Sequence, residues 1–182
     1  MNFRSVLVQD CVLVKPDDSF AEEIQMYRRE MLLAKSSMDG TGQLRHMDDT
    51  SEWLAFNKRF ENEETVPEHF VRAEQFIYIR PKEQTIVGMI QFRHRLNSLL
   101  RNFGGHIGYS IRPSERNKGY ARQMLEDCLK ICKETGLQKV LITCRKDNEA
   151  SRRVILANGG EYEKTVYHEL EDLTIERYWI SL

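Results

Sequence analysis

The second half of the chain alternates between short apolar segments and segments of helical periodicity, and this alternation constrains the fold more than any other feature. A strand is expected at about 106–111, and apolar residues at helical spacing then run from Ala121 to Cys132 and stop at Gly136. A buried strand is expected over 140–144, and a helix capped by Asp147 or Asn148 follows it. This order usually produces parallel neighbouring strands joined by crossover helices.

The rest of the chain predicts antiparallel strands and two earlier helices. Ser19 with Glu22, and Asp49 with Glu52, have the spacing of capping boxes at helix starts. Alternating apolar residues predict one antiparallel pair joined by a turn at 81–83, and a final hairpin. The expected strands lie at 5–14, 74–80, 85–92, 162–168 and 173–180. The sequence therefore predicts an α/β chain of the α+β kind, with a central mixed β-sheet flanked by helices.

Length and charge limit the classes of function. The chain has 182 residues, without a repeat or a linker of low complexity, so a single domain is expected over 1–182. Its 27 basic and 28 acidic residues nearly cancel and form no long run, which argues against nucleic acid or an anionic membrane as partner. No segment has the length of a membrane span or the apolar core of a signal peptide, so a cytoplasmic protein is expected.

The four cysteines indicate neither a disulfide framework nor a metal site. They show no Cys-x-x-Cys spacing. Cys128 and Cys132 are four residues apart in a helical stripe, where packing is favoured over metal binding. No metal is expected.

The turn between the strand at 106–111 and the following helix has the properties of an anion site. At a helix start several backbone N–H groups have no carbonyl partner, and the partial positive charge there attracts anions. Gly119 and Ala121 leave room for a phosphate, while Arg116, Lys118 and Arg122 add cations. The spacing fits neither an ATP-binding loop nor a dinucleotide fingerprint. The alternative is a tight basic turn that binds nothing.

A longer pattern surrounds this turn. It comprises His106-Ile-Gly-Tyr-Ser-Ile-Arg-Pro113, then Arg116-x-x-Gly119-x-Ala121, a helix, the strand at 140–144, and Asn148-x-x-Ser151. The pattern resembles the core of the GNAT superfamily of N-acetyltransferases. Arg93-His94-x-Leu96-Asn97 and Gly104-Gly105-His106 further resemble a bacterial group of predicted acetyltransferases within it. The resemblance implies a GNAT-like acyl-CoA N-acyltransferase fold, with acceptor-side elements in 1–72, an acetyl-CoA-binding core in 73–160 and closing strands in 161–182.

The same resemblance implies a cofactor and the residues that bind it. Acetyl-CoA would be the co-substrate, and its pyrophosphate would meet the backbone amides of the basic turn. Its pantetheine would pair like an added strand in the gap where the strand at 106–111 splays from the strand at 140–144. Asn148, with Ser151 beside it, would contact the CoA arm, although Asn148 also fits a helix cap. The residues assigned to the cofactor are Tyr109, Ser110, Ile111, Arg116, Asn117, Lys118, Gly119, Tyr120, Ala121, Asn148 and Ser151.

The catalytic residues are less clearly marked. An alkylammonium costs about 4–5 kcal/mol to deprotonate at pH 7, so a base is useful. The resemblance places His106 where many members carry a glutamate, which makes His106 the candidate base; the alternative is a histidine that shapes the strand start. By the same resemblance, Ile155 stands where many members carry a tyrosine that protonates the leaving thiolate. Tyr162, Tyr167 or water would then replace it, or the thiolate would leave unaided.

The sequence does not define which molecule accepts the acetyl group. A primary amine of a small molecule or peptide is expected, and a homodimer is suggested by the resemblance. Glu61, Glu63, Glu64 and Glu68 either attract a cationic amine or form a solvated acidic face. Two other classes compete with the enzyme: a non-catalytic sensor that binds acyl-CoA, suggested by Ile155, and an interaction module that has lost the ligand.

Overall fold

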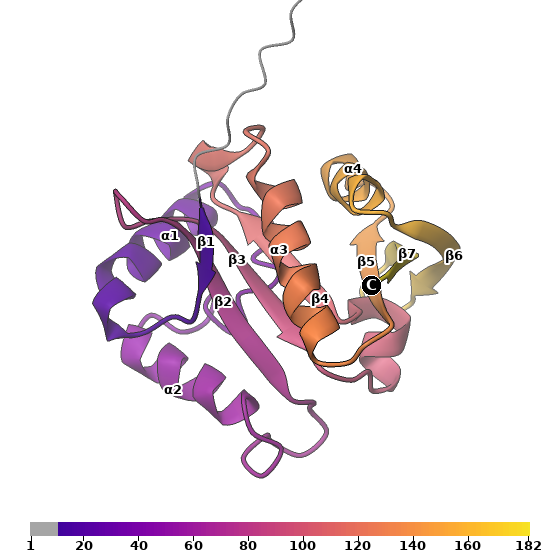
Figure 1. Cartoon of the computed structure of the whole chain (residues 1–182), viewed down its shortest axis with the longest axis horizontal. Coiled ribbons are helices and arrows are strands. Elements are labelled where there is room, and N and C mark those ends of the chain that lie inside the picture. Colours follow the sequence, from indigo (N-terminus) through magenta and orange to yellow (C-terminus); the bar gives the residue numbers. More distant parts are fainter. Residues whose placement is uncertain (1–10) are drawn as a thin grey trace, which may run out of the picture.

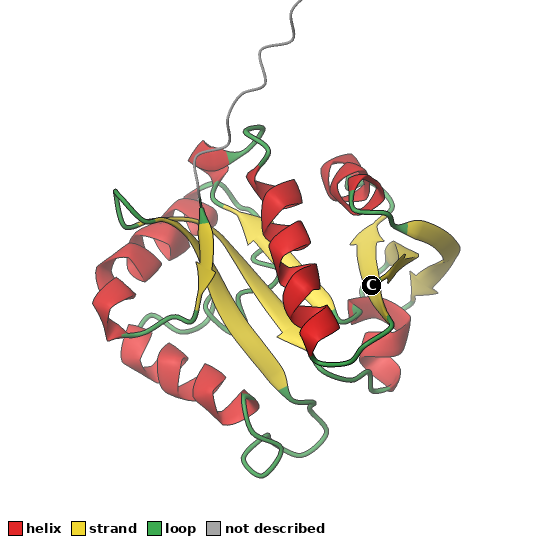
Figure 2. Cartoon of the chain, viewed as in Figure 1, coloured by secondary structure: helices red, strands yellow, loops and turns green. Residues whose placement is uncertain are grey.

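A single mixed sheet organises the molecule. The computed structural model describes residues 11–182, and its seven strands lie in the order β1-β2-β3-β4-β5-β7-β6 (Figures 1 and 2). Neighbouring strands are antiparallel except β4 and β5, which are parallel. The strands are β1 (Val12–Val14), β2 (Ala73–Arg80), β3 (Thr85–Arg93), β4 (Ile107–Ile111), β5 (Lys139–Arg145), β6 (Glu161–His168) and β7 (Leu173–Ser181). The mixed sheet predicted from the sequence is confirmed.

Helices cover both faces of the sheet. They are α1 (Ala21–Leu33), α2 (Thr50–Phe60), α3 (Tyr120–Glu134) and α4 (Glu149–Ala157), with 3-10 turns at Asp18–Phe20 and Pro113–Glu115 and a π-helix at Leu100–Gly104. In Figure 1, α3 crosses the near face of β3 and β4, and α1 and α2 lie on the other face. The core is accordingly divided in two. One apolar cluster joins α3 and α4 to the sheet, and the other joins α1 and α2 to β2 and β3.

The sheet opens between its two parallel strands. β4 pairs with β5 only at Ile107 and Ile142, next to a hydrogen bond from His106 N–H to Leu141 O at 2.7 Å. Beyond this point the two strands diverge, although β4 stays paired with β3 and β5 stays paired with β7. The open region between β4 and β5 is called the fork below. It is the place where the sequence pattern predicted a splay.

Two helix starts differ in how they are capped. Asp49 caps α2 as expected, because its carboxylate accepts the N–H groups of Ser51 and Glu52 at 2.7 and 3.2 Å. The capping box expected at Ser19 is wrong. Asp17 accepts the Ser19 N–H and caps a 3-10 turn, so α1 begins only at Ala21. Phe20 then precedes α1 and makes no side-chain cap hydrogen bond.

The expected first strand is confirmed only in part, because 5–10 of it lies outside the described residues. Within residues 11–182, none of the helices combines the length and apolar character needed to cross a bilayer. Three of the four cysteines, Cys128, Cys132 and Cys144, are buried in the core. No group of three or more metal-ligating side chains comes together within the described part of the chain.

Candidate functional site

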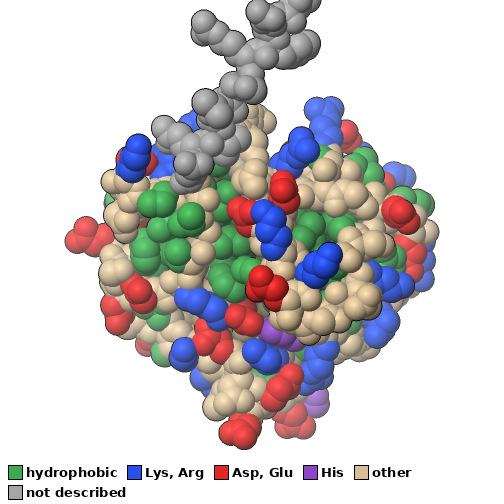
Figure 3. Space-filling model, viewed as in Figure 1, with side chains coloured by type: hydrophobic (Ala, Val, Ile, Leu, Met, Phe, Trp, Pro, Cys, Tyr) green, Lys and Arg blue, Asp and Glu red, His purple; other side chains and the backbone are tan. Residues whose placement is uncertain are grey.

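The turn before α3 leaves a row of backbone amides free. Asn117 and Gly119 adopt left-handed backbone conformations, with φ of 60° and 88°, and α3 begins at Tyr120 without a side-chain cap. Within residues 11–182, no acceptor receives the N–H groups of residues 117–122. Lys and Arg side chains gather at the top of the molecule, over the start of α3 and the neighbouring α4 (Figure 3). The turn therefore combines free donors with positive charge, as an anion site requires.

Two of the three cations expected at this turn are held by other contacts. The Arg116 Nε donates to Ile111 O at 3.1 Å, and its Nη2 donates to Ser36 Oγ, just beyond the end of α1. Lys118 Nζ lies 3.0 Å from a Glu115 carboxylate oxygen. Arg122 stays exposed. The backbone amides, rather than long flexible cations, are thus the main anion donors of the turn.

A buried ion pair supports the turn from below. The Glu115 carboxylate receives two hydrogen bonds from the Arg80 guanidinium at the end of β2, each 3.1 Å long. Only 9% of the Glu115 side chain is exposed. Burial by itself would lower the pKa of Arg80, but Tyr120 and the Glu115 carboxylate together raise it. The pair fixes the 3-10 turn that carries residues 116–119 to the end of the β2–β3 hairpin.

The free edge of β4 faces the fork. Hydrogen bonds from Arg93 N–H to His106 O and from Arg112 N–H to Val87 O fix the register with β3. Because hydrogen-bonded and non-bonded pairs alternate in an antiparallel ladder, the peptide groups of Tyr109 and Ile111 point away from β3, toward the fork. Of these, Ile111 O is taken by Arg116. Tyr109 therefore offers the clearest site for strand-like pairing with an extended ligand.

Ser110 and Tyr109 point to opposite faces of the sheet. Ser110 is buried on the α1 side, where its hydroxyl lies 3.0 Å from the Tyr27 hydroxyl. The Tyr109 hydroxyl crosses toward α4 and lies 2.9 Å from Ser151 Oγ. Burial raises the pKa of the Tyr109 phenol well above its usual value, so the hydroxyl keeps its proton. Of the two, Tyr109 is the side chain that lies on the α4 side of the fork.

Asn148 has the cap role that the sequence allowed. Its side-chain oxygen accepts the N–H of Ser151 at 3.1 Å at the start of α4. The amide nitrogen of Asn148 has no acceptor within the described part of the chain. The Asn148 side chain can therefore cap α4 through its oxygen and, at the same time, donate to a ligand through its amide nitrogen.

His106 is held by the backbone of β5. The imidazole Nδ1 of His106 accepts the backbone N–H of Leu141 at 2.8 Å, and the backbone N–H of His106 donates to Leu141 O. Burial, together with the charges of Arg101 and Arg93, lowers the pKa of the imidazole to about 4. Since a neutral imidazole whose Nδ1 accepts carries its proton on Nε2, His106 has no free lone pair for an amine proton. The geometry favours the structural alternative for His106.

The tyrosines considered as replacement acids lie away from the fork. Ile155 is fully buried and packs in the α3 and α4 core. Tyr162 and Tyr167 are exposed on β6, and β7 separates that strand from β5. Their hydroxyls bond to Thr165 and Asp172. The phenol beside the fork is that of Tyr109, which the sequence assigned only to backbone contacts.

The segment before β4 is organised by Arg93. Its Nη1 donates to Gly104 O and Gly105 O at 2.9 and 3.2 Å, at the end of the π-helix. Asn97 caps the start of that helix by accepting the N–H of Leu100 at 2.9 Å. His94 instead lies 2.7 Å from Glu74 and lowers the pKa of that carboxyl to about 2. The resemblance of residues 93–106 to a family pattern was the only signal in the sequence that pointed to Arg93.

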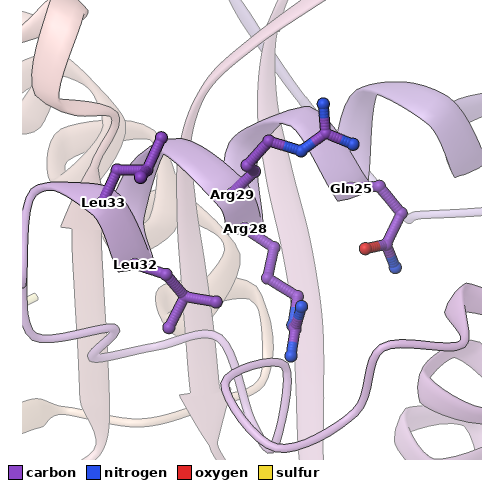
Figure 4. A pocket seen from close by; sticks show the side chains of 5 residues that line it. All are labelled: Gln25, Arg28, Arg29, Leu32 and Leu33. Atoms are coloured by element: carbon purple, nitrogen blue, oxygen red, sulfur yellow. The ribbon is translucent and has the colours of Figure 1, made fainter.

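Two surface hollows lie outside the fork. One lies along α1, and its lining residues are shown in Figure 4: Gln25, Arg28, Arg29, Leu32 and Leu33. Arg28 and Gln25 are already used there, because they donate to the carbonyls of Leu44 and Asp48 at 2.8 and 2.7 Å. The other hollow lies where β5 ends, beside the turn between β6 and β7. Glu61, one of the acidic candidates for the acceptor, is paired with Lys15 and Lys58.

Comparisons with known proteins agree with this architecture. A family model described as an acetyltransferase (GNAT) domain matches residues 12–161. The microcin C7 self-immunity acetyltransferase MccE, solved with acetyl-CoA and AMP, is 17% identical over 97% of this chain and 94% of its own, with a TM-score of 0.68. Mycobacterium smegmatis RimJ, solved with CoA-disulfide, is 18% identical over 94% and 81% of the two chains, with a TM-score of 0.71.

A third similar structure is a spermidine N-acetyltransferase chimera of Vibrio cholerae SpeG and hSSAT. It is 13% identical over 94% of each chain, with a TM-score of 0.65. At these identities the likeness shows the fold. None of the curated protein sequences compared with the chain matches it significantly.

Proposed function

Since the chain belongs to the GNAT acetyltransferase family, we propose that it transfers the acetyl group of acetyl-CoA directly to a primary amine, at the fork between β4 and β5. The observation that carries the proposal is the row of free amides at residues 117–122, beside the open edge of β4. A pyrophosphate there gains charge-assisted hydrogen bonds and the favourable field of the start of α3. Pantetheine then extends along β4 beside Tyr109, with the thioester at the narrow end of the fork.

The chemistry follows from the groups at the fork. A neutral amine attacks the thioester carbonyl, a C–N bond forms, and the C–S bond breaks to release CoA thiolate. The nitrogen loses one proton before the attack and a second afterwards, and one of these protons converts the thiolate to CoA thiol. We assign to Tyr109 a hydrogen bond to the departing sulfur, because its hydroxyl lies beside the fork and keeps its proton. His106 holds the two strands together where they begin to diverge.

The decisive experiment measures acetyl-CoA binding by calorimetry. In Gly119→Glu a carboxylate enters the turn that should hold the pyrophosphate, and binding should be lost. Gly136→Glu is the matched control, because Gly136 has the same φ of 88° at the other end of α3 and open space around it. Both substitutions place a side chain at the same positive φ and add the same charge. Equal binding by the two variants would contradict the proposed cofactor site.

The result also separates the competing classes. Binding of acetyl-CoA with thiol release only in the presence of an amine identifies the enzyme. Tight binding without turnover on any amine would identify a sensor. A wild-type protein that binds no acetyl-CoA would leave only an interaction module.

A further inference from the structure

The loop between α1 and α2 brings a carboxylate to the fork. Gly40 lies directly on β4, where a Cβ added to it would come within 2.0 Å of Gly108 O and 2.6 Å of Tyr109 Cα. Gln75 fixes this contact by donating from its side-chain nitrogen to Gly40 O at 2.8 Å. The preceding residue is Asp39, which is exposed. Its position is therefore set by a close backbone contact on the α1 side of the sheet.

The Asp39 carboxylate also interacts electrostatically with three groups around the fork. Its charge acts on the pKa of Arg93 at the end of β3, of Tyr109 on β4 and of Arg145 at the end of β5. The Gly40 nitrogen, which is joined to Asp39, and Arg93 Nη2 each lie 3.1 Å from where a Cβ of Gly108 would stand, so Asp39 and Arg93 approach the same point of β4. Arg145 is itself paired with Asp147 at 2.7 Å. Within residues 11–182, no hydrogen bond or ion pair engages the Asp39 carboxylate.

Arg93 offers an unused donor at the same place. Its Nη1 is bonded to Gly104 O and Gly105 O, and its Nε to Gln91 at 3.2 Å. Its Nη2 has no acceptor in the part of the chain that the structure describes. That nitrogen lies against β4, 3.1 Å from where a Cβ of Gly108 would stand. A guanidinium N–H that is fixed but unpaired in a partly buried position is a strong donor for an oxygen ligand.

We propose that Asp39 and Arg93 form the acceptor site, in which Asp39 binds the ammonium group and Arg93 Nη2 binds the oxygen of a carbonyl or carboxylate on the adjacent carbon. The inference rests on the proposed function, since it places the acceptor opposite the thioester. It narrows the acceptor to α-amino acyl compounds: an amino acid, its amide or a peptide N-terminus. A polyamine has no oxygen for Arg93.

The acidity of the amine supports the peptide members of the same class. Because the Nδ1 lone pair of His106 is bonded to the backbone, this imidazole is not the base. The α-amino group at a peptide N-terminus has a pKa of about 7.7–8.0, against about 10.4 for an alkylammonium, so its deprotonation at pH 7 costs only about 1 kcal/mol, an advantage that the amine of a free amino acid lacks. Such an amine is partly neutral without a dedicated base. A carboxylate at Asp39 then orients the cation, and its exposure lets the proton pass to solvent.

The test compares four acceptors in a thiol-release assay: L-alanine, L-alaninamide, a short peptide with a free alanine N-terminus, and n-propylamine. The wild type should use at least one α-amino acyl acceptor with kcat/KM about tenfold or more above that for n-propylamine. Asp39→Asn should raise the KM of that acceptor about tenfold, with the acetyl-CoA Kd unchanged within about twofold. The order among the first three acceptors distinguishes a free amino acid from a peptide end.

Asp48→Asn is the control, because it makes the same change at an exposed acid of the same loop. Arg93→Lys keeps the charge but loses the forked donors, so the preference over n-propylamine should shrink. Equal KM values for Asp39→Asn and Asp48→Asn would overturn the inference. The inference would also be overturned if n-propylamine were turned over at least as fast as every α-amino acyl acceptor. It would equally be overturned if the wild type bound acetyl-CoA but turned over none of the three α-amino acyl acceptors. Failure of the wild type to bind acetyl-CoA would instead refute the proposed function.

Discussion

Leu141 and His106 are joined by two hydrogen bonds: the Leu141 N–H donates to the imidazole Nδ1 at 2.8 Å, and the Leu141 carbonyl accepts the His106 N–H at 2.7 Å. The histidine thereby continues the β4–β5 ladder with a side-chain atom at the last point before the strands diverge. An acceptor of this kind must stay neutral, because protonation of Nδ1 would break the bond to Leu141. The imidazole is 6% exposed, and its pKa is lowered to about 4.

The first prediction concerns stability against pH. The folded pKa of His106, about 4, lies below the unfolded value of about 6.5, so the unfolded chain binds the proton more tightly. The stabilisation is complete above pH 6.5 and is lost as the pH falls toward 4. It amounts to about 3 kcal/mol in full, of which about 2 kcal/mol is lost by pH 5. Urea unfolding at pH 7.5 and pH 5 measures the loss.

His106→Asn isolates this contribution. The asparagine side-chain oxygen can accept the Leu141 N–H but does not titrate, so the variant should lose less stability than the wild type between the two pH values. Carboxyl groups with lowered pKa, such as Glu74, are present in both proteins and cancel in the comparison. A wild type and a variant with the same pH dependence would show that His106 titrates normally.

The second prediction tests Tyr109 as the donor to the departing sulfur. Tyr109→Phe removes the hydroxyl beside Ser151 but keeps the ring. The kcat should fall about tenfold, the usual effect of losing one charge-assisted donor, while the acetyl-CoA Kd changes little. Tyr167→Phe removes an equivalent hydroxyl on β6, bonded to Asp172, and should leave kcat unchanged. An unchanged kcat in Tyr109→Phe would mean that the thiolate leaves without this donor.

The third prediction concerns the support under the basic turn. Glu115→Gln removes the carboxylate from the Arg80 guanidinium, whose side chain is 19% exposed and which also interacts with Tyr120 and Glu83. Removal of one partner from such a pair should cost about 2–3 kcal/mol in the free energy of unfolding. Glu134→Gln, an exposed change at the end of α3, should cost almost nothing. If Glu115→Gln unfolds at the same urea concentration as the wild type, the pair contributes nothing net.

Local residue types predicted most of the secondary structure. The expected strands at 74–80 and 85–92 agree with β2 and β3 to within one residue, and Gly136 ends α3 with a positive φ. The π-helix at Leu100–Gly104 was not predicted, because it depends on Arg93 and Asn97, which contact it through side chains rather than through periodicity. Contacts of that kind leave no regular spacing in the sequence.

In the candidate site, too, some features follow from neighbouring residues and others depend on contacts between distant ones. The left-handed glycine and the free amides of the turn at 116–121 follow from its own residues, and the structure has them. The direction of the Arg116 side chain could not be predicted from the residues of the turn, because it depends on Ser36, which is 80 positions away. Asp39 was not identified either, because a lone acidic residue in a loop has no pattern, and only the contact of Gly40 with β4 brings it to the fork.

The last prediction separates the two roles of Asn148. Aspartate caps a helix as well as asparagine does, so Asn148→Asp should keep the bond to the Ser151 N–H and the stability of the fold. It loses the amide N–H groups and adds a negative charge, so it should weaken acetyl-CoA binding about tenfold or more if Asn148 donates to the CoA arm. Asn148→Ala should in addition cost about 1 kcal/mol of stability by loss of the cap. Calorimetry and urea unfolding on both variants give the answer: an aspartate variant with wild-type affinity would restrict Asn148 to the cap, whereas lost affinity at unchanged stability would place its amide on the cofactor.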